Sequence, residues 1–231
     1  MKRLLAIFVF SLIARGHDTI TTKLTWSREI SRIVNSRCVS CHRPGGKAFS
    51  LLTYKEARPW ARAIAEEVLE RRMPPWGAVK GFGDFRNDQS LTQEQLELIA
   101  QWVDGGAPEG DPKNLAPPPK AHPRSPTATS TREIVVQGDF TAGRAIVLDG
   151  IRPKAVPAAA SVQITAELPD GSVEPVVWLY NYQPRHGHPF WLRTPLELPR
   201  GAVIRGIPPG WRIALLVSNS TRGSGGRSAR Y

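Results

Sequence analysis

The stretch NSRCVSCHRPGGKAF, residues 35–49, contains both cysteines of this 231-residue chain, three positions apart, and a histidine directly follows the second. Three kinds of site use this spacing: a redox dithiol, half of a metal site, and the covalent attachment point of a haem group. In a haem attachment point, Cys38 and Cys41 would add to the two vinyl groups of the porphyrin, and His42 would lie under the iron. The residues on either side of the stretch distinguish among these possibilities.

The sequence around the two cysteines favours haem attachment. Apolar residues recur with helical spacing before the motif, at Trp26, Ile30, Ile33 and Val34. They predict a helix that runs into Cys38, and the Arg-Pro-Gly-Gly sequence at 43–46 predicts a turn after the motif. A thioredoxin-like dithiol would instead have a strand before the motif and a helix after it. A zinc site needs four ligands, whereas residues 24–112 contain no second cysteine pair and no other histidine.

Two further helices are expected in residues 24–112. Capping-box spacings mark two helix starts, at Thr53–Glu56 and at Thr92–Gln95. The first helical region is expected to extend from Pro59 to Arg72, because the two prolines after Met73 cannot continue a helix. The second helix should end at the glycine pair 105–106.

Met73 is the only methionine besides the first residue, and its thioether is a candidate sixth ligand for haem iron. It lies at the predicted end of a helix, just before two prolines, where the chain could hold its sulfur over a haem face. The competing axial ligands are His186, His188 or water. On the other face, we expect the second ring nitrogen of His42 to donate to a backbone carbonyl near the following turn, with Pro44 as the candidate.

Together these features resemble class I c-type cytochromes: the CxxCH motif, a helix that ends in Met-Pro-Pro-Trp at 73–76, and a last helix that ends in Gly-Gly-Ala-Pro at 105–108. More narrowly, residues 24–112 are similar to cytochrome domains of exported bacterial proteins. In such proteins a β-domain resembling copper type II, ascorbate-dependent monooxygenases often follows. The resemblance implies a small all-α cytochrome c fold and electron transfer as the activity. It also implies one covalent haem c, attached through Cys38 and Cys41 and bound axially by His42 and Met73.

Residues 132–218 change to the pattern of short strands. Apolar residues alternate with polar ones over residues 162–168, and Pro-Asp-Gly at 169–171 is a turn signal. This pattern predicts a small all-β antiparallel sandwich or barrel. The expected fold class is therefore α+β in two domains, with a cytochrome c domain at 24–112, a proline-rich linker at 113–131 and a β-domain at 132–218.

The sequence predicts different features at the two ends of the chain. Two basic residues and an apolar run over residues 4–14 predict a signal peptide at 1–16, so we expect a periplasmic or secreted protein of the cell envelope. Residues 219–231 are rich in Gly, Ser and Arg, which predicts a disordered tail.

The net charge of +11 has its source mainly in the second half. Residues 113–231 hold 15 basic and 7 acidic side chains, whereas residues 17–112 are balanced. Because the excess is scattered, we expect no nucleic-acid partner and instead a peripheral association with an anionic membrane surface or cell-envelope polymer. Basic residues also flank the CxxCH motif and Met73, which favours an acidic redox partner protein. These residues are Arg37, Arg43, Lys47, Arg71, Arg72 and Lys80.

The sequence thus predicts an exported monohaem cytochrome that carries single electrons between redox partners and is not itself an enzyme. Two alternatives stay open: an electron-feeding component of a copper-dependent, monooxygenase-like system, and a haem-based ligand sensor. The monooxygenase relatives use several copper-binding histidines and a methionine, whereas residues 132–231 offer only His186 and His188 and no methionine. A polar loop around these two histidines is therefore favoured over a copper site.

Overall fold

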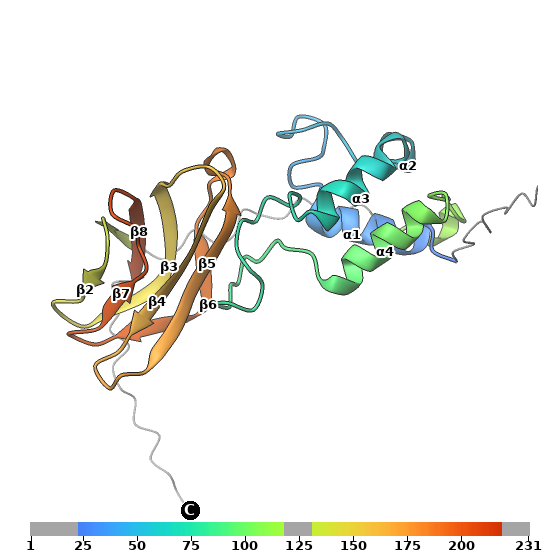
Figure 1. Ribbon diagram of the computed structural model, residues 1–231. Coiled ribbons are helices and arrows are strands. Elements are labelled where there is room, and N and C mark those ends of the chain that lie inside the picture. The colour runs from blue at the N-terminus through green and yellow to red at the C-terminus, as the bar shows by residue number, and fades with distance from the viewer. Residues whose placement is uncertain (1–22, 118–130, 219–231) are drawn as a thin grey trace, which may run out of the picture.

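The computed structural model describes residues 23–117 and 131–218 (Figure 1). The predicted signal peptide, most of the predicted linker and the predicted tail lie outside these residues. Helices lie in the first range and strands in the second, and an irregular segment connects the two parts in Figure 1. The helices are α1 (Ser31–Arg37), α2 (Tyr54–Ala57), α3 (Ala61–Leu69) and α4 (Gln93–Asp104). The strands are β1 (Thr131–Val136), β2 (Phe140–Thr141), β3 (Ile146–Ala155), β4 (Ala160–Glu167), β5 (Val173–Tyr182), β6 (Phe190–Leu198), β7 (Val203–Arg205) and β8 (Arg212–Ser218).

The helices surround a small apolar core. A π-helical turn (Trp26–Ile30) leads into α1, and the rings of Trp26 and Trp102 lie 6.1 Å apart in this core. Both predicted capping boxes are present. In each, a threonine side chain accepts a backbone N–H while the Glu or Gln three residues later accepts from the threonine N–H, which satisfies donors that a helix start leaves free. α4 ends at Asp104, and Gly105, the first glycine of the predicted pair, is its C-cap.

The helical region before Met73 is shorter and more broken than expected. A 3₁₀ turn occupies residues 58–60, and α3 ends at Leu69, three residues before the predicted end at Arg72. Arg71 adopts the left-handed conformation, with φ of 55°, which the helix cannot include. The chain therefore leaves the helix before the prolines are reached, and the Met73 N–H bonds to the Glu67 carbonyl at 3.1 Å.

In residues 131–218, eight antiparallel strands form two sheets with the orders β1-β8-β3-β6 and β2-β7-β4-β5. Side chains of both sheets share one hydrophobic core. Ile151 and Phe190 enter it from the first sheet, and Ile164 and Leu179 from the second; all four are fully buried. The alternation along β4 places every second residue in this core, as a half-buried strand requires.

The segment between α3 and α4 attaches to both sheets at their edges. Along β5, the Val79 N–H donates to the Trp178 carbonyl at 2.9 Å, and the Tyr180 N–H donates to the Gly77 carbonyl at 3.1 Å. Along β6, the Arg193 N–H donates to the Asp84 carbonyl at 2.8 Å. Because β5 and β6 are the edge strands of their sheets, this segment covers backbone groups that would otherwise be unpaired.

The predicted fold class, an all-α cytochrome c fold followed by a separate β-domain, is wrong. In the described residues the helices are short, and two four-stranded antiparallel sheets dominate, so this part of the chain is mostly β. The physical reason lies in the segment after Met73. Trp76 and Phe85, which the sequence placed in a helical domain, are 3% and 5% exposed and belong to the core of the sheets. The domain boundaries themselves remain a prediction.

Candidate haem-attachment site

The backbone of the CxxCH motif continues α1 by one turn. Cys38 follows the last residue of the helix, and its N–H donates to the Val34 carbonyl at 2.8 Å. The N–H groups of Cys41 and His42 then both donate to the Cys38 carbonyl, at 3.1 and 2.9 Å. Residues three and four apart in such a turn share one side of it. The local fold therefore brings the two cysteines and the histidine together in one turn, and buried Val39 anchors this turn in the helical core.

The loop after the motif folds back onto it. The Ala48 N–H donates to the Cys41 carbonyl and the Leu51 N–H to the His42 carbonyl, each at 3.2 Å. Gly46 makes this possible, because a Cβ at that position would lie 2.3 Å from the Cys41 carbonyl oxygen. Glycine is thus required at position 46 by the close approach of two backbone segments.

The ring of His42 is oriented by a backbone carbonyl. Its Nδ1 lies 3.0 Å from the carbonyl oxygen of Phe49. A carbonyl oxygen can only accept, so Nδ1 carries the proton, and the lone pair on Nε2 is available to a metal ion. The sequence predicted that a backbone carbonyl would accept this hydrogen bond, but the prediction of Pro44 as the acceptor was wrong. The acceptor is Phe49, five residues further along the loop.

The two cysteines are free thiols. Burial, with a smaller contribution from neighbouring Cys41, raises the pKa of the Cys38 thiol to about 12. Cys38 also lies at the C-terminal end of α1, where the helix dipole disfavours a thiolate. Redox dithiols instead have a cysteine of lowered pKa, typically at a helix N-terminus. The structure therefore argues against the redox-dithiol alternative.

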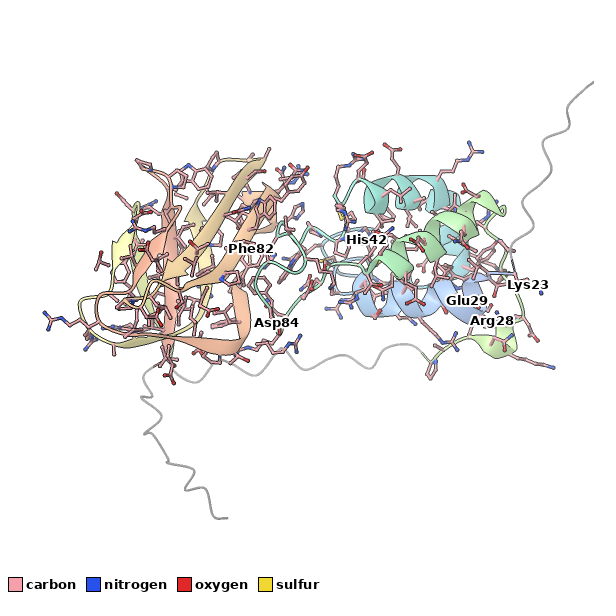
Figure 2. The ribbon with its side chains drawn as sticks, turned by 60° about the horizontal axis from the view of Figure 1, so that its bottom comes forward. Lys23, Arg28, Glu29, His42, Phe82 and Asp84 are labelled. Atoms are coloured by element: carbon pink, nitrogen blue, oxygen red, sulfur yellow. The ribbon has the colours of Figure 1, made fainter. Side chains whose placement is uncertain are left out.

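An exposed aromatic surface adjoins His42. The rings of His42 and Phe49 meet edge to face at 5.0 Å, and Phe49 packs against Trp60 at 4.6 Å. Both Phe49 and Trp60 remain about half exposed, at 49% and 48%. Figure 2 shows His42 at the end of the helical part that faces the sheets. Exposed aromatic groups of this size beside a histidine are suited to contact a flat apolar ligand.

Arg37, the residue before the first cysteine, has an unsatisfied donor. Its Nη1 donates to the Asp88 carbonyl at 2.9 Å. Its Nε is buried and has no hydrogen-bond partner among the described residues. A buried donor without a partner is costly, so this atom marks a place for an acceptor beside the motif. The sequence named Arg37 only as one of several flanking cations, and no sequence signal reveals the orphaned nitrogen.

Met73 is half-buried at the border between the helical core and the sheets. It packs against the helical core and lines two cavities, of about 510 and 230 Å³. The larger one extends between α4 and Trp178 of β5. None of the hydrogen bonds or ring contacts of the described residues joins Met73 to the CxxCH turn, so its place as an axial ligand remains a prediction.

The two histidines of the β5–β6 loop have different surroundings. His188 stacks on Trp76 at 4.8 Å, and its Nε2 and Nδ1 lie 3.0 and 3.1 Å from the carbonyl oxygens of Trp76 and Pro189. This ring is therefore engaged in packing the connecting segment onto the sheets. His186 lines the 230 Å³ cavity together with Met73. Burial, then the positive charges of Arg185 and Lys47, and then His188 lower the pKa of His186.

Some of the cations that the sequence assigned to a positive surface have acidic partners. Arg72 forms ion pairs with Glu66 and Glu67 at 3.2 and 3.0 Å. Lys80 forms an ion pair with Asp88 at 2.8 Å. Burial alone would raise the pKa of Asp88, but hydrogen bonds from Lys80 and Ser90 outweigh it, so the pKa is lowered. The local positive field is therefore weaker than the sequence suggests, and a preference for an acidic partner remains a prediction.

No group of three or more His, Cys, Asp or Glu side chains in residues 23–117 and 131–218 is placed to hold a metal ion. None of the helices in those ranges combines the length and the apolar character of a membrane span. Comparison of the chain with protein-family models, with curated proteins and with solved structures gives no match.

Proposed function

We propose that this protein is an exported c-type cytochrome that carries single electrons, with one haem attached through Cys38 and Cys41 and bound axially by His42 and Met73. The observation that carries the proposal is the orientation of His42. Its Nδ1 is held by the Phe49 carbonyl and its Nε2 is left for a metal, on the same turn as two free thiols. This chemistry depends on the local arrangement of residues 37–73 and not on an all-α domain.

The surroundings of the motif support a haem group as the ligand. The half-exposed rings of Phe49 and Trp60 offer an apolar surface to a porphyrin. The buried Nε of Arg37 has no acceptor among the residues that the structure describes, and a haem carboxylate would supply one. In such a haem group, the two thiols of the CxxCH turn would bond to the porphyrin edge, and the imidazole would bind the iron at its centre.

Each residue has a defined role in this proposal. Bound haem supplies a centre that gains and loses one electron without a change of bonds in the protein. Cys38 and Cys41 fix the group to the chain by thioether bonds. The Phe49 carbonyl keeps the His42 ring in place and makes its Nε2 a stronger donor. Met73 would supply a second protein ligand to the iron and would favour the reduced state, which is why a carrier is preferred over a ligand sensor or an enzyme.

The test is the visible spectrum of the chain matured with a haem-attachment system. We expect the weak long-wavelength band of a sulfur–iron(III) bond in the unmodified protein and its loss in Met73→Ala. Ser40→Ala, a change at an exposed position inside the motif, is the control and should keep the band. A protein with covalent haem but without this band would contradict Met73 as ligand, and carbon monoxide binding to the reduced unmodified protein would favour the sensor alternative.

A further inference from the structure

A third cavity, of about 620 Å³, lies between the segment that follows Met73 and the edge strands β5 and β6. Its volume falls in the range of cavities that bind small molecules, about 300–1,000 Å³. Neither Met73 nor any residue of the CxxCH turn lines it. An inference about this cavity therefore does not depend on a haem group.

Much of the lining is apolar. Trp76 and Phe85, only 3% and 5% exposed, contact each other edge to face at 5.7 Å, and Leu192 of β6 lies in the same lining. The two edge strands also contribute Pro175 and Pro195. Because proline has no N–H to donate, this part of each edge disfavours the addition of another strand. The lining thus suits an apolar group better than a peptide backbone.

The walls of the cavity are held in place from both sheets. The connecting segment is hydrogen-bonded to β5 at Val79 and to β6 at Asp84. Between these points, a Cβ at Gly83 would lie 2.6 Å from the Val176 carbonyl oxygen, and the φ of Gly83 is 78°. Only glycine combines this close approach with this conformation. The cavity is therefore formed by the fold itself, as small-molecule sites usually are.

Three carboxylates line the cavity, and two of them have a cationic partner. Lys80 pairs with Asp88 at 2.8 Å, and Arg193 pairs with Asp84 at 3.0 Å. The third, exposed Glu174 of β5, forms no side-chain hydrogen bond or ion pair with any residue in the part of the chain that the structure describes. One negative charge without a partner thus lies beside an apolar surface.

We propose that this cavity binds a small organic cation with a single positive charge and an apolar body. The ammonium group pairs with Glu174, and the apolar body lies against Trp76, Phe85 and Leu192. A charge-assisted hydrogen bond to the carboxylate distinguishes the cation from a neutral molecule of the same shape. An anion of that shape is disfavoured, because carboxylates outnumber cationic groups in the lining. Binding is reversible and changes no covalent bond.

The experiment is calorimetric titration of the full mature chain with three probes that share a phenyl ring and differ in charge: phenethylamine, phenethyl alcohol and hydrocinnamate. We expect saturable binding of the amine at neutral pH, weaker binding of the alcohol and the weakest binding of the carboxylate. Glu174→Gln should weaken amine binding by about three- to fivefold, the scale of a partly exposed ion pair, and leave alcohol binding unchanged. Glu197→Gln, at an exposed position of β6 that does not line the cavity, is the matched control and should bind the amine normally.

A second variant tests the location of the bound probe. Thr194 is exposed and lines the cavity, so Thr194→Trp should fill part of it and abolish binding of the amine, with folding checked by thermal unfolding. Amine binding that persists in this variant would place the site elsewhere and overturn the proposal. Equal affinities for amine and alcohol, or no saturable binding of the amine, would overturn it as well. So would a dimer that Thr194→Trp dissociates, because a second copy of the chain would then occupy the cavity.

Discussion

At the scale of single residues, the CxxCH motif predicts which residue types form the site, whereas the contacts that orient them depend on the fold. The residue types of CxxCH and the need for a carbonyl at His42 Nδ1 follow from haem chemistry. The carbonyl that fills this role belongs to Phe49, because the loop over residues 43–51 folds back onto the motif. The local sequence does not show which residue of the loop supplies it. The orphaned Nε of Arg37 likewise depends on distant packing against Asp88.

The orphaned donor makes Arg37 a test of the haem environment. In the haem-loaded protein, we expect Arg37→Ala to lower the reduction potential, because a positive charge near the iron stabilises the less positive reduced state. A hydrogen bond to a charged group contributes about 1.5–3 kcal/mol, which sets the expected scale. Arg37→Lys keeps the charge and should retain most of the potential. Equal potentials for the two variants, measured by redox titration, would exclude a direct electrostatic role.

The raised pKa of Cys38 predicts a dependence of stability on pH in chain expressed without haem attachment. An unfolded thiol ionises near pH 8.5, whereas the folded one ionises only at about 12. The unfolded state thus loses its proton first, so the free energy of unfolding should fall between about pH 9 and 12, by on the order of 4–5 kcal/mol. Urea unfolding at several pH values should show a smaller fall for Cys38→Ala; parallel profiles would contradict the burial of this thiol.

At the scale of elements, helix starts were predictable and one helix end was not. The capping boxes at residues 53–56 and 92–95 are local hydrogen-bond patterns, and both were found where the spacing predicts them. The end of α3 at Leu69 follows from the left-handed conformation of Arg71, which is not a residue type that favours it. The prolines after Met73 could not continue a helix, but the left-handed conformation of Arg71 ends α3 before the chain reaches them.

The loop that returns to the motif depends on Gly46. In Gly46→Ala, the new Cβ would collide with the Cys41 carbonyl at 2.3 Å, so the turn must shift. We expect a loss of stability of about 1–3 kcal/mol and less covalent haem per chain, because Cys41 and the Phe49 carbonyl would both move. Gly143→Ala, where a Cβ would meet no atom of the described residues within 4 Å, is the control for thermal unfolding and haem content. Equal haem content in both variants would show that the loop does not position the site.

At the scale of the whole molecule, the fold class could not be predicted because the decisive segment carries no periodic pattern. The alternation in residues 162–168 marks β4 correctly, but Trp76 and Phe85 lie in irregular chain, where apolar residues do not reveal which core they enter. The structure places them in the core of the sheets, and the backbone around them pairs with β5 and β6. Figure 2 shows Phe82 and Asp84 of this segment beside the sheets. The segment after Met73 is thus the physical link between the proposed site and the β part.

This link predicts that the two parts of the molecule depend on each other. Trp76 is 3% exposed and lies three residues after Met73, so Trp76→Ala should lower the free energy of unfolding by about 3–5 kcal/mol. It should also weaken the sulfur–iron band of the haem-loaded protein, because the chain that positions Met73 loses its anchor. Val173→Ala, at a position that is 59% exposed, should change neither stability nor band. A destabilised Trp76 variant with an unaltered band would show that Met73 is positioned by the helical core alone.

The intact mass of the mature chain, measured under denaturing conditions after expression with a haem-attachment system, shows whether a haem is covalently bound. We expect a mass increase of one haem in the unmodified chain, none in Cys38→Ala/Cys41→Ala, and an unchanged increase in Ser40→Ala. A mature, folded chain with no added mass and with its two thiols free or joined to each other would contradict covalent haem attachment and, with it, the proposed function.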